Sequence, residues 1–106
     1  MKQIQVIVRA FKLDAVRTAL ENAKILRMTL IDVRRGGKEV SRQKQYRGRD
    51  YTEDVEEIKL EVVAEDDEVE SVADAIMNTL RAGQLCDGEV AILPMERVFR
   101  VRVGKL

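Results

Sequence analysis

Between about residues 36 and 54 the sequence contains no apolar run that could enter a hydrophobic core. This stretch separates two halves of the chain, and each half alternates between strand-like and helix-like patterns. Structureless loops longer than about 12–15 residues are uncommon inside compact domains and are usually functional or disordered. We therefore expect one small domain in which this stretch is either the functional surface or a flexible hairpin extension.

The first half has the periodicity of a strand, a helix and a second strand. Residues 3–9 alternate in a period of two, which is typical of a strand. Residues 12–23 carry a single apolar stripe at helical spacing. Residues 27–35 alternate again, until Gly36-Gly37 ends the strand.

The second half begins with the same pattern. Residues 58–63 alternate as a strand, and the helix after them carries apolar residues at helical spacing as far as Leu80. Asp66 and Asp67 precede this helix, and Asp67 has capping-box spacing to Glu70. We therefore expect these aspartates to cap the helix.

The end of the chain predicts two more strands. Residues 89–93 are strand-like, and Pro94 restricts the residues after it to an edge strand or a turn. Residues 97–103 alternate once more. They predict a short last strand with Phe99, Val101 and Val103 inward and Arg100 and Arg102 outward.

This order predicts an α+β fold, namely a ferredoxin-like βαββαβ sandwich with a long loop between strands 2 and 3 and a short C-terminal strand. Both helices should cover one face of the sheet. A chain of 106 residues has the usual size of one domain. Because this fold hosts many functions, function has to be argued from particular residues.

Composition excludes several kinds of site. The chain has no histidine and one cysteine, so one subunit cannot form a disulfide, an ordinary zinc, copper or nickel site, or a Ser-His-Asp or Cys-His catalytic group. Basic and acidic residues both number 19, and this zero net charge gives no case for nucleic acid. The amino terminus lacks a signal-peptide core, and no apolar segment approaches the roughly 20 residues that cross a bilayer. We expect a cytoplasmic protein.

Four stretches carry a recognisable pattern, in chain order Phe11-Lys12-Leu13-Asp14, Tyr46-Arg47-Gly48-x-x-Tyr51, Gly83-x-x-x-Asp87-Gly88 and Arg100-x-Arg102-x-Gly104. In order and spacing they resemble the PII nitrogen-regulatory signal proteins over nearly the whole chain. By this resemblance residues 1–106 are a single PII-like domain. Residues 36–54 are its T-loop, residues 82–89 its B-loop and residues 100–106 its C-terminal phosphate-binding segment.

The resemblance implies a homotrimer with no tightly bound cofactor and no metal, whose effector is ATP, ADP or AMP in clefts between subunits. It implies that the T-loop binds a target protein, often a membrane transporter, which would recruit the protein to the membrane face. The residues implied at the nucleotide are Ile7, Thr29, Gly36, Gly37, Lys38, Val63, Cys86, Asp87, Gly88, Arg100 and Arg102. Those implied at the partner are Tyr46, Arg47, Gly48 and Tyr51, and the position of Tyr51 is a covalent modification site in some relatives.

Three acidic residues depart from the family pattern. Glu39 stands where the family has a glutamine that helps to bind 2-oxoglutarate with magnesium, and Glu57 falls near a lysine that binds its carboxylate. Acidic groups at both places should repel a dicarboxylate, so we expect weak or absent 2-oxoglutarate binding. Glu89 replaces a phosphate-binding lysine of the B-loop, which predicts weaker binding of a triphosphate than of ADP or AMP.

The candidate nucleotide residues also have plainer interpretations. Arg100 and Arg102 lie two apart on a predicted strand, so they share a face at about 7 Å spacing and can grip a polyphosphate. Without a ligand the same pair is a solvated sheet face. Gly36-Gly37 permits close approach of the backbone to a phosphate, or simply ends a strand. Ile7 and Val63 would surround the adenine by resemblance, or pack against ordinary neighbours.

The T-loop has a basic limb from Arg34 to Arg49 and an acidic limb from Asp50 to Glu57. Charge runs of this kind are usually solvated and mobile, and here the limbs could pair with each other or steer a charged partner. Tyr46 is in the basic limb, and exposed tyrosine beside arginine is common in protein interfaces. We expect the loop to be mobile until a partner binds it.

Two other functions fit parts of the sequence. An RNA-binding ferredoxin-like module would explain the basic limb, but the aromatic residues that stack bases on its central strands are missing. A small enzyme could use Asp87 and Glu89 as an acid and a base, but nothing else indicates a substrate cleft. We therefore favour a regulator that is not an enzyme and does not bind nucleic acid.

Overall fold

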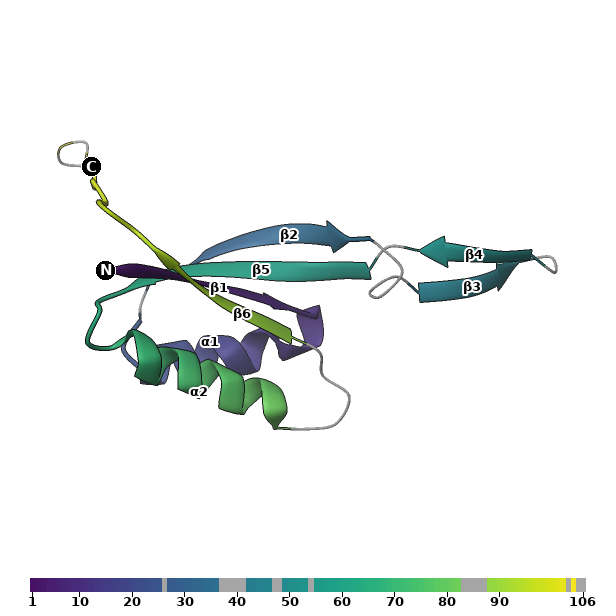
Figure 1. The fold of residues 1–106 in the computed structure, drawn as a ribbon, viewed down its shortest axis with the longest axis horizontal. Helices are drawn as coiled ribbons and strands as arrows, with labels where there is room; N and C mark the ends of the chain where they lie inside the picture. The colour runs from purple at the N-terminus through teal and green to yellow at the C-terminus, as the bar shows by residue number, and fades with distance from the viewer. Residues whose placement is uncertain are drawn as a thin grey trace.

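The computed structural model describes residues 1–25, 27–36, 42–46, 49–53, 55–82, 88–102 and 104. Its elements in chain order are β1 (Lys2–Val8), a 3-10 turn η1 (Ala10–Lys12), α1 (Leu13–Asn22), β2 (Thr29–Arg35), β3 (Arg42–Tyr46), β4 (Arg49–Glu53), β5 (Val55–Ala64), α2 (Val69–Arg81) and β6 (Gly88–Pro94). One antiparallel four-stranded sheet has the order β2-β5-β1-β6, and β3 and β4 form a separate two-stranded sheet. Both helices lie against one face of the larger sheet (Figure 1), which confirms the predicted α+β ferredoxin-like sandwich.

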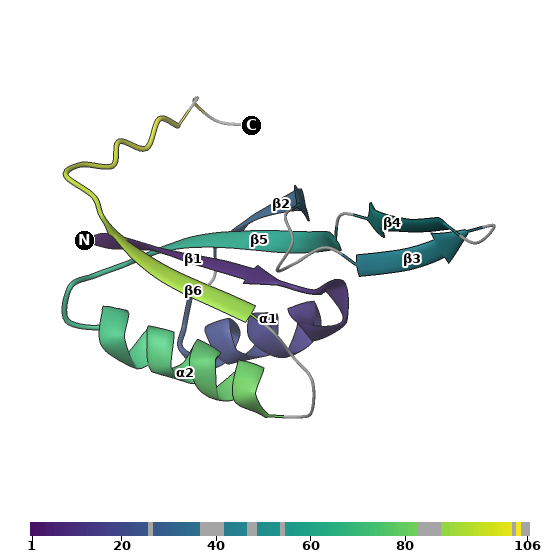
Figure 2. The same cartoon turned by 45° about the vertical axis from the view of Figure 1, so that its right-hand side comes forward.

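The hydrophobic core lies between that face and the helices. Alternation along β1 turns Ile4, Val6 and Val8 toward the helices, and all three are fully buried. The apolar stripes of the helices meet them, as the spacing predicts, and their buried members are Val16, Leu20, Val69, Val72, Ala73, Ile76 and Leu80. Neither of the described α-helices covers the opposite face (Figure 2), which we call the open face.

Helix α1 ends in a left-handed turn. Lys24 has a φ of 64°, its N–H donates to the carbonyl of Glu21 at 2.9 Å, and the N–H of Ile25 donates to the carbonyl of Leu20 at 2.9 Å. This pair of bonds is a Schellman motif, which satisfies the last carbonyls of a helix. It turns the chain toward β2 and places Ile25 in the core.

The predicted capping of α2 by Asp66 and Asp67 is wrong. The N-cap is Glu68, whose side chain makes no capping bond to the helix and instead accepts a hydrogen bond from the N–H of Glu65 at 3.0 Å. The Asp66 carboxylate accepts a hydrogen bond from the ammonium group of Met1, which lowers the pKa of Asp66 below its ordinary value. The Asp66 carboxylate therefore binds the positively charged amino terminus instead of capping the helix, as its spacing predicted.

The other end of α2 is tied to η1. The Lys12 ammonium donates to the carbonyl of Ala82, and a second contact joins it to the carbonyl of Thr79 at 3.5 Å. A cation at the carboxyl end of a helix balances the negative end of the helix dipole. The contact fixes the position of Ala82, where the predicted B-loop begins.

The described part of the stretch between β2 and β5 is not structureless, because it forms a hairpin, which is one of the two expected alternatives. β3 and β4 form an antiparallel ladder in which Arg42 is opposite Glu53 and Tyr46 is opposite Arg49. The hairpin extends beyond the main sheet (Figure 1), and the molecule is 59 Å long. Its strands are polar along their whole length, so no alternation of apolar and polar residues reveals them.

The predicted last strand over residues 97–103 is wrong in its described part. Residues 95–102 belong to no strand, and Phe99 and Val101 are 78% and 88% exposed rather than inward. The chain leaves the sheet after Pro94 (Figure 2). Pro94 has no N–H with which to continue a ladder, and an extended segment needs a strand edge as its partner.

Candidate functional site

The structure places the described nucleotide candidates in two groups at opposite ends of the main sheet. Thr29 begins β2, and Val63 lies near the end of β5 at the same end of the sheet. Gly36 follows β2 and Gly88 begins β6, at the end that faces the hairpin. We call the end with Thr29 and Val63 the arginine end, because Arg100 lies there. We call the end with Gly36 and Gly88 the hairpin end.

A cavity of about 420 Å³ brings three predicted residues together at the arginine end. Its lining includes Thr29 from β2, Val63 from β5 and Arg100 from the segment after β6. Arg100 also lines a neighbouring cavity of about 560 Å³, together with Met1 and Glu68. A guanidinium group in this position can donate two parallel hydrogen bonds to a phosphate.

Basic residues dominate the charge of the 420 Å³ cavity. Its described lining residues include three cations, Lys24, Arg27 and Arg100, and one acid, Glu61. The Glu61 carboxylate already lies 3.8 Å from the Lys59 ammonium. The cavity therefore keeps a positive charge that suits an anionic ligand.

Lys24 reaches this cavity from the left-handed turn that ends α1. A residue with a side chain costs about 1–2 kcal/mol in this conformation, which glycine adopts freely. Strain of this kind clusters at functional sites, where the surrounding structure holds it in place. The turn is thus an energetically unfavourable place for lysine that nevertheless brings a cation to the cavity.

At the hairpin end, Gly88 has a packing role of its own. A Cβ atom at this position would lie 2.8 Å from Cδ1 of Leu80 in α2, which is closer than real Cβ contacts. Gly88 therefore allows β6 to start directly against α2.

Ile7 is half-buried on the open face, and the sheet register places it opposite Lys59 on β5 and Glu89 on β6.

An ion cluster crosses the open face at the hairpin end. Arg35, the last residue of β2, places Nη1 at 3.8 Å from Oε1 of Glu57 and Nη2 at 3.0 Å from Oε2 of Glu89. Glu57 lies on β5 and is 8% exposed, whereas Glu89 lies on the far edge strand β6 and is 54% exposed. One guanidinium group thus connects the two edge strands of the sheet.

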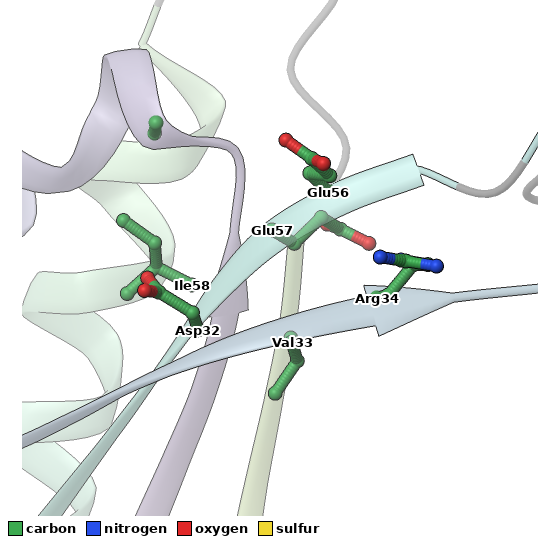
Figure 3. Close-up of a pocket in the computed structure, with 7 residues that line it drawn as sticks. Asp32, Val33, Arg34, Glu56, Glu57 and Ile58 are labelled. Atoms are coloured by element: carbon green, nitrogen blue, oxygen red, sulfur yellow. The ribbon is translucent and has the colours of Figure 1, made fainter.

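A third cavity, of about 400 Å³, lies beside the ends of β2 and β5, and none of its described lining residues is a predicted nucleotide residue. Asp32 and Ile58 point to one side of these strands in Figure 3, and Val33 points to the other. The described residues of its lining include three carboxylates, those of Asp32, Glu56 and Glu57, and the guanidinium group of Arg34. This excess of acids among the described residues does not favour a phosphate.

Arg100 and Arg102 do not lie on a strand. Arg102 is exposed and belongs to no strand, so the expectation that Arg100 and Arg102 share one strand face is wrong.

The two tyrosines that were predicted to contact a partner lie in the hairpin. Tyr46 ends β3, and Tyr51 is in the middle of β4. Six further candidates lie outside the described residues, namely Gly37, Lys38, Arg47, Gly48, Cys86 and Asp87.

Sequence reasoning did not select three cations that the structure places at these sites. Lys24 and Arg27 fall between a helix and a strand, where basic residues are common and carry no motif. Arg35 had a signal, because the acids at Glu57 and Glu89 stand where the resemblance implies lysines. Only the fold shows that one cation, Arg35, faces both of these acids.

Neither a metal centre nor a membrane span is found in the described part of the chain. Within it, no group of three or more Cys, Asp or Glu side chains is placed to hold a metal ion. Each described helix is too short or too polar to cross a membrane. The four aromatic residues of the chain lie in η1, the hairpin and the C-terminal segment, so none of them forms a base-stacking platform on the main sheet.

Comparison with known proteins adds a likeness over the whole chain. The family model of nitrogen regulatory protein P-II matches residues 1–105. A nitrogen regulatory protein P-II of Microchaete diplosiphon is 42% identical over 106 residues, which cover 99% of this chain and 95% of that protein. The corresponding protein of Pasteurella multocida is 38% identical with the same coverage, and that of Porphyra purpurea is 36% identical over 107 residues, 100% of this chain and 96% of that protein.

Proposed function

The chain belongs to the nitrogen regulatory protein P-II family, and from this premise we propose that it is a regulator that binds ATP, ADP or AMP between the subunits of a homotrimer. Proteins of the family are signal-transducing regulators rather than enzymes, and they are homotrimers that interact with target proteins. In this proposal the segment 36–54, which contains the β3–β4 hairpin, binds the target. By family analogy the target is a membrane transporter.

The division of the candidate residues between two ends of one sheet is the observation that carries the proposal. Gly88 is level with Ile58 across β1, and Ile58 is five residues from Val63 along β5, or about 16 Å. A single phosphate group cannot reach both places, since a hydrogen bond spans about 3 Å. Two half-sites that are too far apart within one chain suit a ligand held between neighbouring copies.

The open face supports the assembly. It carries half-buried apolar residues, Ile7, Val63 and Leu93 among them, beside polar residues such as Gln5 and Glu61. An antiparallel sheet can leave one face to water. The segment after β6 adds further exposed apolar residues, above all Phe99 and Val101. In a trimer, a second copy would cover this apolar surface. Covering this surface also gives the C-terminal segment a partner.

The acids at the hairpin end narrow the choice of effector. Glu57 and Glu89 lie at the hairpin end and share one guanidinium group, that of Arg35, and the remaining negative charge disfavours a dicarboxylate and a highly charged phosphate chain. We therefore propose ADP or AMP as better ligands than ATP, with weak or absent 2-oxoglutarate binding. Basic Arg100, Lys24 and Arg27 at the other half-site supply the attraction.

Calorimetric titration of the whole protein with ADP tests the proposal. We expect Arg100→Ala to weaken ADP binding about tenfold or more, because a hydrogen bond to a charged group contributes roughly 1.5–3 kcal/mol. Arg81→Ala is the matched control, since Arg81 is an exposed arginine in the last turn of α2 that lines neither arginine-end cavity. Equal affinity of the native protein and Arg100→Ala would show that the nucleotide binds elsewhere.

A further inference from the structure

The ion cluster of Arg35, Glu57 and Glu89 contains two unequal contacts. Nη1 of Arg35 faces the Glu57 carboxylate at 3.8 Å, and Nη2 faces the Glu89 carboxylate at 3.0 Å. Glu57 is 8% exposed, so loss of its cation would leave a buried charge without compensation, which is strongly unfavourable. Glu89 is 54% exposed, and water can solvate it if the guanidinium leaves. Arg35 can therefore release Glu89 more easily than Glu57.

The cluster lies between the two glycines of the hairpin-end half-site. Arg35 directly precedes Gly36, and Glu89 directly follows Gly88. A phosphate held by the backbone at these glycines would arrive beside Nη2, the guanidinium nitrogen that Glu89 holds. A guanidinium group binds phosphate and carboxylate through the same parallel hydrogen bonds, so the two anions would compete for one set of donors.

We propose that Arg35 is the phosphate-binding cation of the hairpin-end half-site, and that Glu89 competes with the phosphate for Nη2 and thereby sets the affinity for nucleotide. This inference rests on the nucleotide binding proposed above. Nucleotide binding exchanges the Arg35–Glu89 ion pair for an Arg35–phosphate contact, while Nη1 stays with Glu57. Glu89 then acts through Arg35, in addition to any direct repulsion between the two anions.

A double-mutant cycle measured by calorimetric titration with ADP separates competition from direct repulsion. The proteins are the native chain, Glu89→Gln, Arg35→Gln and the double variant. A partly exposed ion pair is worth at most about fivefold in an equilibrium constant, so we expect Glu89→Gln to tighten ADP binding by about that factor. In the Arg35→Gln background, we expect the same change to tighten binding by less than about twofold, because there is no guanidinium to release.

Asp74→Asn is the matched control, since it removes one carboxylate from the exposed side of α2, away from both half-sites. It should leave ADP affinity unchanged. If Arg35→Gln fails to fold, Arg35→Lys keeps a cation beside Glu57 but lacks the forked pair of donors, and it should likewise reduce the effect of Glu89→Gln.

Two results would overturn the inference while leaving nucleotide binding intact. Equal tightening by Glu89→Gln in both backgrounds would mean that Glu89 acts by repulsion alone. Unchanged ADP affinity in folded Arg35→Gln would mean that Arg35 does not contact the phosphate. Absence of ADP binding by every protein in the cycle, the native chain included, would instead overturn the proposed function and this inference with it.

Discussion

Lys24 has a backbone conformation that favours glycine and a side chain that lines the basic cavity. We expect Lys24→Gly to raise the free energy of unfolding by about 1 kcal/mol, because the strain of a left-handed residue with a Cβ is removed. The same change should weaken ADP binding, since one cation of the cavity is lost. Urea denaturation and calorimetric titration measure the two effects.

Lys24→Arg is the control, because it keeps both the charge and the strain and should change neither quantity much. A less stable Lys24→Gly protein would mean that the side chain makes packing contacts worth more than the strain. Unchanged ADP affinity would remove Lys24 from the nucleotide site.

Asp66 gives the fold a predictable dependence on pH. Its hydrogen bond to the Met1 ammonium, together with the positive charge of that group and of Lys2, lowers the pKa of Asp66 in the folded protein. A lowered folded pKa stabilises the fold above the unfolded pKa, and this contribution is lost as the pH falls through the folded pKa.

We expect Asp66→Asn to be slightly less stable than the native protein at neutral pH, by an amount that shrinks to nothing in acid. Urea midpoints of the two proteins across this pH range provide the measurement. A difference that is constant at all pH values would show that the charge of Asp66 is not involved.

At the scale of elements, the contact between α2 and β6 depends on one glycine. A Cβ atom at Gly88 would lie 2.8 Å from Cδ1 of Leu80, a side chain that is buried in the core. We expect Gly88→Ala to lower the free energy of unfolding by about 1–3 kcal/mol, the usual effect of overpacking. Gly104→Ala is the control, because no atom of the described residues lies within 4 Å of a Cβ there. Equal urea midpoints for both variants would show that Leu80 moves aside without cost.

Both α-helices and the four strands of the main sheet were predictable from the sequence, whereas the two hairpin strands were not. β1, α1, β5 and α2 each place apolar residues at the period of their element, because each buries one side in the same core. The hairpin strands Arg42–Tyr46 and Arg49–Glu53 have no alternation of apolar and polar residues, so the period of two does not reveal them. For the segment 97–102 the prediction failed in the opposite way. Its residues alternate as in a strand, but it pairs with no described strand of its own chain.

The cap of α2 failed for a different reason. Asp66 and Asp67 have the right spacing to cap a helix, but spacing cannot include a charge that lies 65 residues away in sequence. The Met1 ammonium reaches Asp66 only because β1 and the end of β5 are adjacent in the sheet. Sequence reasoning finds local partners and misses those that the fold brings together.

At the scale of the whole molecule, the open face predicts assembly. Leu93 is a half-buried apolar residue of β6, opposite Gln3 in the sheet register. We expect Leu93→Lys to prevent trimer formation, because a charge buried in an interface without a partner is strongly unfavourable. Light scattering should then give 12.1 kDa instead of about three times that mass.

Asn78→Lys adds the same charge on the exposed side of α2 and should leave the assembly intact. A trimer that persists in Leu93→Lys would show that the open face is not buried between subunits, and a native protein of 12.1 kDa would show that there is no trimer.

The candidate site was only half predictable, because it is divided over the molecule. Thr29, Val63 and Arg100 were selected by resemblance, and one cavity contains all three. Arg35 could not be selected from its neighbours in sequence, since its partners Glu57 and Glu89 lie on two other strands. The acids Glu57 and Glu89, which differ from the family pattern, could be seen in the sequence. That Arg35 is the cation facing them could be found only from the arrangement of the strands in the sheet.

The hairpin beyond the sheet is a lever arm. A five-residue strand is roughly 17 Å long, so a tilt of about 10° where β3 leaves the body would displace the far end of β3, at Tyr46, by about 3 Å. That displacement is as long as a hydrogen bond, whereas the same tilt hardly moves atoms at the pivot. A partner that holds the tip would therefore detect, as made or broken contacts, a rearrangement at the base that is itself much smaller than one atom.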